Sequence, residues 1–288
     1  MSCKRYNMIT KLNRKISHKK EEYFCFSERI INMTKTTVNT AAPLLEVKDI
    51  VKIYRTRNSD QQCRALNGIG FKINKGEFVA IMGESGSGKT TLLNLLAVLD
   101  IPTEGTITIG GQNLVNFDDK SISRFRRENL GFVFQEFNLL DNFTLQENIA
   151  LPLVLSGMKK SDIEKKISPI AEMLNIKSLL DKYPYQVSGG EKQRAAIARA
   201  VIVNPKILLA DEPTGALDSN NSKQTLEYFQ KINKETDQTI VMVTHSMKAA
   251  LASSRVLVIK DGIIENDIKV EGKTLEQLEN EISVSLKK

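Results

Sequence analysis

Short runs of hydrophobic residues, separated by stretches with helical periodicity, dominate the central part of the chain. Phe78–Met82, Ile207–Ala210 and Ile240–Val243 contain no polar position. Such uninterrupted runs are typical of parallel strands that helices cover on both faces, whereas half-exposed strands alternate. The pattern predicts an α/β fold with a parallel sheet at its centre.

A second pattern, in which apolar residues alternate with polar ones, precedes and interrupts these runs. It occurs over residues 45–53, over residues 71–73, and over Thr106–Gly110 ahead of a Gly-Gly turn. Alternation of this kind indicates strands with one buried face, and the turn favours an antiparallel arrangement. We therefore expect an antiparallel β subdomain beside the parallel core.

The region from about residue 136 to residue 190 has helical signals instead. Ser161 is followed three residues later by Glu164, which is a capping-box pattern. Pro169 interrupts the helical pattern, so it is expected to start or kink a second helix. This region is interpreted as a helical subdomain.

Composition excludes several classes of protein. The 288 residues are 41% hydrophobic and 26% charged, a mixture that can bury a core, and no apolar run approaches the roughly 20 residues of a membrane-spanning helix. Cysteine occurs three times, without the paired spacing of a zinc module or of a secreted disulfide scaffold. A reducing cytoplasmic environment fits this usage.

The net charge of +7 comes almost entirely from the N-terminus. Residues 1–42 hold nine of the 41 basic residues and three of the 34 acidic ones, so 32 and 31 remain for the rest of the chain. We expect residues 1–43 to be a disordered basic extension, with Met33 as a candidate translation start, and residues 269–288 to be a helical C-terminal tail. A basic extension is also the one feature that favours contact with nucleic acid.

Directly after the run that ends at Met82, the chain matches the pattern G-x-x-x-x-G-K-[ST], and an apolar stretch over Leu92–Leu99 predicts a helix behind it. In this context the glycines let backbone N–H groups surround a polyphosphate at a helix N-terminus. Lys89 would reach the β- and γ-phosphates and Thr90 would offer an oxygen to Mg²⁺. The candidate nucleotide-binding residues are Gly83, Glu84, Ser85, Gly86, Ser87, Gly88, Lys89, Thr90 and Thr91.

Two acids follow the buried run Ile207–Ala210. Carboxylates at the carboxyl end of a parallel strand project into the crevice where open α/β sheets bind ligands. Asp211 is therefore a candidate Mg²⁺ ligand, through water, and Glu212 a candidate base for the water that attacks the γ-phosphate.

The remaining landmarks resemble the nucleotide-binding subunit of an ATP-binding cassette (ABC) transporter, over about residues 44–268. Val187-Ser188-Gly189-Gly190-Glu191 is similar to the family signature, and the other matches are Gln135 (Q-loop), Gly215–Asp218 (D-loop), His245 (switch histidine) and Tyr54 (adenine stacking). The resemblance implies a P-loop NTPase (RecA-like) core that binds ATP and Mg²⁺. It implies that Gln135 shares the metal with Thr90 and Asp211, and that Lys89, Gln135, Glu212 and His245 act in hydrolysis.

The signature departs from the family pattern at two positions, Val187 for Leu and Glu191 for Gln. The first exchanges two apolar side chains. The second places an acid at a helix N-terminus, where the dipole favours it but where the γ-phosphate would also lie, so its influence on nucleotide affinity stays open. Ser188, Gly189 and Gly190, which the resemblance assigns to nucleotide binding, are all present.

The resemblance also implies partners. One phosphate loop and one signature predict a homodimer of head-to-tail copies that sandwich two nucleotides. An integral membrane permease would handle the transported compound without direct contact from this chain, which would sit at the cytoplasmic face of the membrane. The apolar segment Phe137–Leu155 is a candidate groove for that permease.

Within the family, Phe134–Leu140, Thr144–Ile149 and Leu151–Leu153 look like the macrolide-export and lipoprotein-release branch, and most like ATPases of antimicrobial-peptide (bacitracin-type) resistance and export. Two alternatives stay open. One is a lipoprotein-release or cell-division ATPase, with the same motifs. The other is a soluble cassette ATPase that acts on nucleic acid, which the basic extension favours and the single cassette disfavours.

Overall fold

The computed structural model describes residues 42–55, 62–114 and 118–287, all within the compact unit Ala42–Lys288. The expected basic extension, including Met33, lies outside the described residues except for its last two positions.

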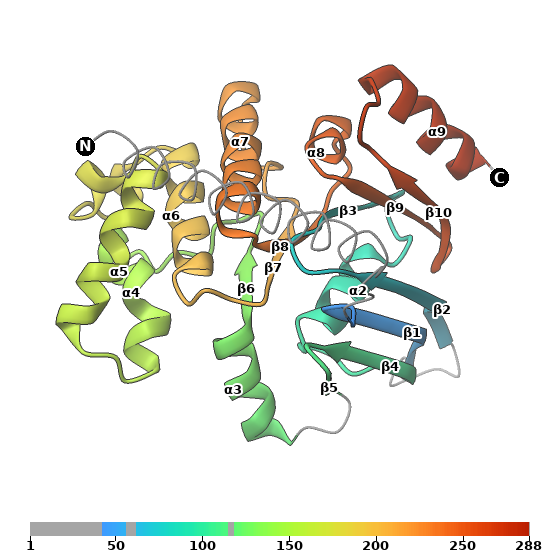
Figure 1. The fold of residues 1–288 in the computed structure, drawn as a ribbon, viewed down its shortest axis with the longest axis horizontal. Helices are drawn as coiled ribbons and strands as arrows, with labels where there is room; N and C mark the ends of the chain where they lie inside the picture. The colour runs from blue at the N-terminus through green and yellow to red at the C-terminus, as the bar shows by residue number, and fades with distance from the viewer. Residues whose placement is uncertain (1–41, 56–61, 115–117, 288) are drawn as a thin grey trace, which may run out of the picture. The chain divides into compact units, whose positions relative to one another are not determined.

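The centre of this unit is a six-stranded sheet in the order β10-β9-β3-β8-β7-β6 (Figure 1). Neighbouring strands are parallel, except that β10 runs antiparallel to β9. The strands are β3 (Phe78–Gly83), β6 (Leu130–Val133), β7 (Ile207–Asp211), β8 (Thr239–Val243), β9 (Arg255–Lys260) and β10 (Ile263–Lys269). The three uninterrupted apolar runs form β3, β7 and β8, as predicted.

Alternate residues of these strands pack on opposite faces. Leu209 and Val241 belong to a core shared with α2 (Lys89–Leu96) and the antiparallel strands, whereas Leu208 and Met242 belong to a core shared with the helices across the sheet. Both faces are thus buried, which explains why the runs contain no polar position.

A separate four-stranded sheet has the order β2-β1-β4-β5, with antiparallel pairing throughout. Its strands are β1 (Leu45–Arg55), β2 (Gln62–Ile73), β4 (Glu104–Ile109) and β5 (Gln112–Asn113). This confirms the predicted antiparallel β subdomain. Its apolar face and the parallel sheet enclose α2 in one core.

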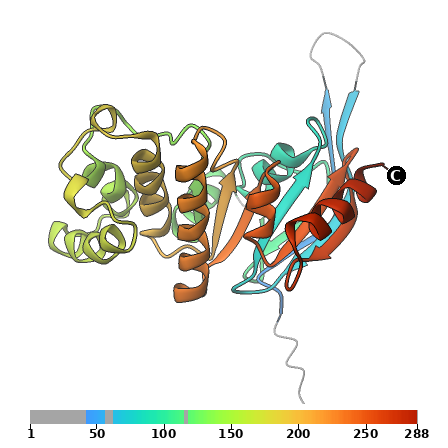
Figure 2. The ribbon, with the colours of Figure 1, turned by 90° about the horizontal axis from the view of Figure 1, so that it is seen from above.

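The other helices fall into two groups. α4 (Leu145–Leu155), α5 (Lys160–Met173) and α6 (Gly189–Val201) lie beyond the β6 edge of the parallel sheet in both ribbon views (Figures 1 and 2). The rest are α3 (Asp119–Asn129), α7 (Ser219–Thr236), α8 (Met247–Leu251) and α9 (Leu275–Lys287), with 3-10 turns at Lys177–Leu179 and Pro184–Gln186. No helix among the described residues is long and apolar enough to cross a membrane.

Two local expectations were wrong, and a third was wrong in part. The helix after the phosphate loop ends at Leu96, because the backbone turns into the left-handed region at Val98 (φ 54°). The expected capping box at Ser161 does not form, since α5 begins at Lys160 and the carbonyl of Lys159 accepts the first helical bonds. Pro169 starts no second helix: α5 continues through it, although a proline removes one backbone hydrogen bond.

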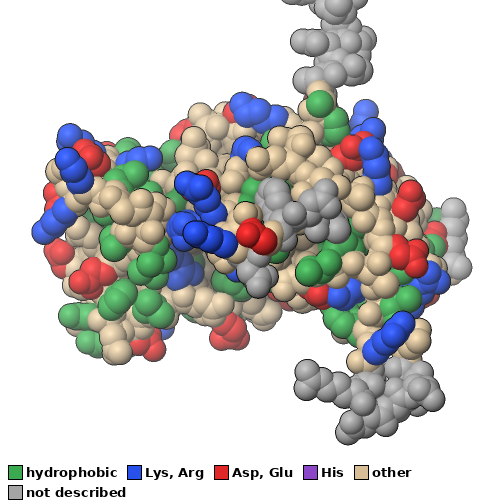
Figure 3. Space-filling view, turned by 90° about the horizontal axis from the view of Figure 1, so that it is seen from below, with side chains coloured by type: hydrophobic (Ala, Val, Ile, Leu, Met, Phe, Trp, Pro, Cys, Tyr) green, Lys and Arg blue, Asp and Glu red, His purple; other side chains and the backbone are tan. Residues whose placement is uncertain are grey.

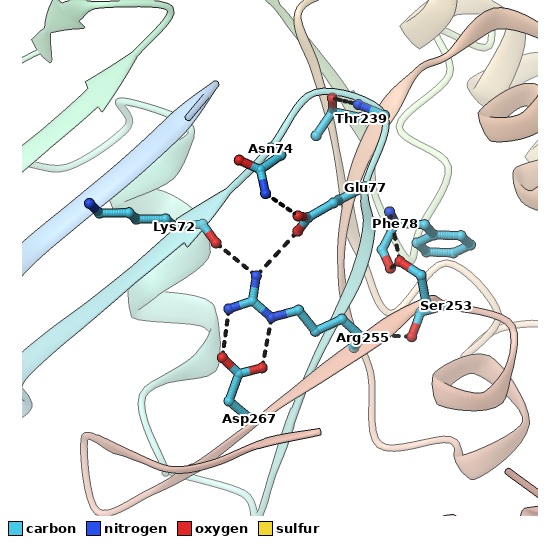
Figure 4. Close-up of polar contacts among 10 residues, drawn as sticks. Lys72, Asn74, Glu77, Phe78, Thr239, Ser253, Arg255 and Asp267 are labelled. Atoms are coloured by element: carbon cyan, nitrogen blue, oxygen red, sulfur yellow. Dashed lines mark hydrogen bonds and ion pairs between the residues drawn. The ribbon is translucent and has the colours of Figure 1, made fainter. Parts of the chain in front are cut away.

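Arg255 on β9 connects the two sheets (Figure 4). Its guanidinium donates to both oxygens of Asp267 on β10, at 2.7 and 2.6 Å, and to the backbone carbonyl of Lys72 on β2, at 2.8 Å. It also contacts Glu77, the residue before β3, at 3.2 Å. The start of β3, which leads into the phosphate loop, is therefore fixed from both sheets.

Candidate active site

The predicted phosphate loop connects the end of β3 to the start of α2. Gly83 has no room for a side chain, since a Cβ there would lie 2.1 Å from the carbonyl oxygen of Ile259. Lys89 is 8% exposed as a whole residue. Its Nζ donates to the loop's own carbonyls at Gly83 (3.0 Å) and Glu84 (2.7 Å). The lysine thereby closes the loop into a ring around its amide groups.

Two carboxylates share this crevice with the lysine. Burial lowers the pKa of Lys89, and the negative charges of Glu212 and Asp211 oppose that shift. Burial also raises the pKa of Asp211, and the neighbouring charge of Glu212 raises it further. Hydroxyl Oγ of Ser87 in the loop is buried and has no hydrogen-bond partner among the described residues. The crevice thus holds a confined cation beside the loop amides, which suits a polyphosphate.

Glu212 and His245 meet although 33 positions separate them in the sequence, because β7 and β8 are parallel neighbours and both residues follow a strand end. Nδ1 of His245 lies 3.0 Å from Oε1 of Glu212. The backbone of Glu212 is in the left-handed region (φ 41°), with its N–H donating to the carbonyl of Val243 at 2.9 Å. The histidine is exposed, so a water or phosphate can reach the pair.

The remaining predicted metal ligands lie at the same edge of the sheet. Gln135 follows β6 and its side chain lies against Gly215 on the loop after β7. Thr90 is exposed in the first turn of α2. No hydrogen bond between described residues joins Gln135 to Thr90 or Asp211. These three candidate metal ligands therefore lie at one edge of the sheet without direct contact through hydrogen bonds.

The side-chain oxygens of Thr90, Gln135 and Asp211 are ligands that fit a hard divalent cation. Mg²⁺ takes oxygen ligands, and one carboxylate with two neutral oxygens leaves positions for water and substrate phosphate. A bound cation would also offset the burial and the like charge that raise the pKa of Asp211.

Tyr54 lies on β1 and is held by contacts that the sequence did not reveal. Its hydroxyl donates to Asp100 at 2.8 Å, and Nζ of Lys52 lies 4.9 Å from the centre of its ring. Nζ of Lys52 also donates to Asp100, at 2.5 Å. Burial, and then the bond to Asp100, raise the pKa of the Tyr54 hydroxyl. With 41% of the residue exposed, the ring is fixed at its edge and still accessible.

The signature residues form the start of α6. Ser188 is the N-cap, and its N–H and hydroxyl both donate to Oε2 of Glu191, at 2.7 and 2.8 Å. These bonds, the backbone one first, hold the pKa of Glu191 below its usual range. A Cβ on Gly190 would lie 2.0 Å from Oδ1 of Asn221 on α7. The acid that departs from the family pattern is therefore a structural partner of Ser188.

The signature does not complete the crevice of its own chain. No hydrogen bond between described residues joins residues 188–191 to the phosphate loop, and both ribbon views place α6 away from α2 (Figures 1 and 2). The signature and the phosphate loop therefore lie on separate elements among the described residues.

The sequence also gave no indication of Arg199. From α6, it donates to the backbone carbonyls of Phe137 (2.9 Å) and Asn138, two consecutive residues with left-handed φ values of 59° and 50°. Burial lowers the pKa of its guanidinium. Arg199 thus fixes the irregular segment that follows Gln135, and only the fold could reveal this, since 61 residues separate it from Asn138.

Comparison with known proteins gives a consistent result. A family model described as "ABC transporter" matches residues 66–215. The chain is 50% identical over 227 residues to the ABC transporter ATP-binding protein YxdL of Bacillus subtilis, covering 79% of this chain and 87% of that protein. It is 48% identical over 221 residues to the bacitracin export ATP-binding protein BceA of Halalkalibacterium halodurans, covering 77% and 87%.

Among solved structures, the ATP-binding cassette MJ0796, in a dimeric post-hydrolysis state bound to ADP and phosphate, superposes with a TM-score of 0.72. The two chains are 38% identical, and the match covers 80% of this chain and all of the other.

Proposed function

The chain belongs to the ABC transporter family, and on this premise we propose that it is an ATPase subunit that drives a separate integral membrane permease. The observation that carries the proposal is the convergence of Lys89, Asp211, Glu212 and His245 in one crevice. A lysine confined among loop amides and two acids beyond it suit the binding and hydrolysis of a nucleoside triphosphate.

Each residue has a distinct role in this proposal. Lys89 exchanges its contacts with the loop carbonyls for the β- and γ-phosphates. Glu212 accepts the proton of the attacking water, while His245, 3.0 Å away, holds that carboxylate and faces the γ-phosphate. Thr90, Gln135 and Asp211 would hold Mg²⁺, which supplies charge neutralisation of the phosphates when bound. The exposed Tyr54 ring would stack on the adenine.

A second copy of the chain would complete each site. Ser188, Gly189 and Gly190 lie apart from the phosphate loop of their own chain, so their N–H groups at the start of α6 would contact the γ-phosphate on the partner. The dimeric state of the MJ0796 cassette supports this arrangement. Such a contact is isologous, with two equivalent sites per dimer.

The permease would dock on a groove of about 320 Å³ that β6, α3, α4 and α6 line, and to which the proposed helical subdomain of residues 136–190 contributes Asn138, Leu151, Pro152 and Leu155. Its apolar lining includes Phe132, Leu151 and Leu155, and two guanidinium groups, Arg127 and Arg199, flank it. Figure 3 shows Lys and Arg side chains gathered near α3, with hydrophobic side chains toward the helical end of that face. A short amphipathic segment of the permease fits this chemistry, and it would keep the chain at the cytoplasmic face of the membrane.

For the transported compound we propose a peptide antibiotic of the bacitracin kind, because a relative with 48% identity is a bacitracin export ATP-binding protein. The permease, rather than this chain, would contact that compound.

Bacitracin sensitivity of a deletion strain tests the proposal. Complementation with the natural chain should restore resistance, whereas Glu212→Gln should not. Leu155→Glu, which charges the groove, should abolish resistance while the purified chain still hydrolyses ATP; Val154→Glu is the matched control, since Val154 is exposed but does not line the groove. Unchanged sensitivity of the deletion strain, with lipoproteins retained in the membrane or division defects, would instead support the alternative assignments.

A further inference from the structure

Gln193 on α6 is a buried residue that none of the functions above uses. Its side chain is 0% exposed. The amide Nε2 donates to the backbone carbonyl of Pro213 at 2.6 Å and, more weakly, to that of Phe134 at 3.4 Å. Two carbonyl oxygens at these distances require the donor end of the amide to face them.

The positions of these carbonyls connect three parts of the candidate active site. Pro213 directly follows Glu212, and Phe134 directly precedes Gln135. Gln193 itself lies in the second turn of the helix that Ser188 caps. One side chain therefore joins the signature helix, the segment of the Q-loop glutamine and the segment of the candidate base.

The backbone at Glu212 needs such support, because it occupies the left-handed region. Its N–H is bound by the carbonyl of Val243 and its own carbonyl accepts from Gly215, both at 2.9 Å. The bond from Gln193 to Pro213 is a further restraint on this turn, and it comes from α6, whereas Ser222 on α7 donates to the carbonyl of Thr214 at 3.4 Å. A strained turn persists only where its surroundings determine it fully.

Stability alone does not favour an amide at this position. Oε1 of Gln193 is buried and accepts no hydrogen bond from any described residue. An unpaired buried carbonyl costs free energy that an apolar side chain of the same length would avoid. We therefore infer that the hydrogen bonds donated by Nε2 to Pro213 and Phe134 are the reason for an amide at position 193, since they offset the cost of the unpaired Oε1.

We propose that Gln193 is a positioning residue that couples the signature helix to Glu212 and Gln135 of the same chain. When Ser188 engages the nucleotide of the partner copy, the movement of α6 reaches the candidate base through this amide. The inference rests on the roles proposed for Ser188, Gln135 and Glu212.

The test compares Gln193→Met with Gln238→Met in the full-length chain. Gln238 is a matched control, because it is 5% exposed and its Nε2 likewise donates to a proline carbonyl, that of Pro205, and to Thr239. Both variants lose a buried donor of two hydrogen bonds, but only Gln193→Met also removes an unpaired carbonyl, so its melting temperature should fall by no more than that of Gln238→Met. Only Gln193→Met should lose kcat for ATP hydrolysis, by about 10- to 100-fold, with KM changed by less than about threefold.

Equal kcat values for the two variants, within about twofold, would overturn the proposal. If Gln193→Met does not fold, the kcat values of Gln193→Glu and Gln238→Glu are compared between about pH 8 and about pH 6. A buried glutamic acid at position 193 that gains a proton regains a hydrogen-bond donor for the carbonyl of Pro213. The ratio of their kcat values should rise toward the acidic end, and a flat ratio refutes the idea. Full turnover by Glu212→Gln would instead refute the proposed function.

Discussion

Replacing Glu212 by Gln is the sharpest test of the proposed hydrolysis. The amide has the shape of the carboxylate, and its Oε1 can keep the 3.0 Å contact with Nδ1 of His245. The two backbone hydrogen bonds at Glu212 do not involve the side chain. We therefore expect the free energy of unfolding to change by no more than about 0.5 kcal/mol.

Turnover should respond very differently. A general base contributes about 10²- to 10⁴-fold to a rate, or about 2.7–5.4 kcal/mol of the activation barrier. The lost negative charge also changes its neighbours, because Glu212 raises the pKa of both Asp211 and Lys89. With one anion fewer in the crevice, ATP should bind as tightly as before or more tightly.

Phosphate release at saturating ATP and Mg²⁺ measures the loss, and size-exclusion chromatography with ATP should show a dimer that persists because the nucleotide is not consumed. Glu235→Gln, an exposed change on α7, is the control for charge alone. Turnover of a folded Glu212→Gln protein within about twofold of the natural chain would show that Glu212 is not the base.

Three further outcomes are expected. Tyr54→Phe and Asp100→Ala should each weaken ATP binding by about three- to tenfold and leave tripolyphosphate binding unchanged. The double variant should bind ATP no more weakly than either single variant, and additive losses would contradict the shared contact. Glu191→Gln should lower stability at neutral pH, because the folded-state pKa of Glu191 is depressed and its carboxylate stabilises the fold. In denaturant titrations the difference should shrink as the pH falls below 4.5, the ordinary pKa of a glutamate, and through the lower folded-state pKa, where the carboxylate is protonated. A pH-independent difference would reject this. Arg255→Met should cost about 1–3 kcal/mol in urea unfolding, since it removes the charged hydrogen bonds to Asp267 on the neighbouring strand and the bond to the Lys72 carbonyl of the other sheet. An unchanged free energy of unfolding would show that these bonds are dispensable.

Local signals accounted for most of what the sequence could predict. The phosphate loop lies between a buried strand and a helix, and the acids end another buried strand, because each motif includes its own structural context within about ten residues. Parallel strand ends then bring Lys89, Glu212 and His245 together without any further signal.

The sequence could not predict contacts between residues that lie far apart along the chain. Asp100 lies 46 positions from Tyr54, and Gln193 lies 59 from Phe134, and no periodicity links such pairs. The expected capping box at Ser161 failed because its pattern is compatible with the helix interior as well as with a helix start. Packing of Ile163 and Ile167 in the core sets the position of α5 instead.

The ring that Lys89 closes with the carbonyls of Gly83 and Glu84 means that atoms of the loop itself hold its shape. The entropy of shaping this receptor is then lost during folding rather than during ligand capture. Only the Lys89 side chain then has to exchange partners when ATP binds, so association with the monomer should follow a single fast phase whose rate rises linearly with concentration.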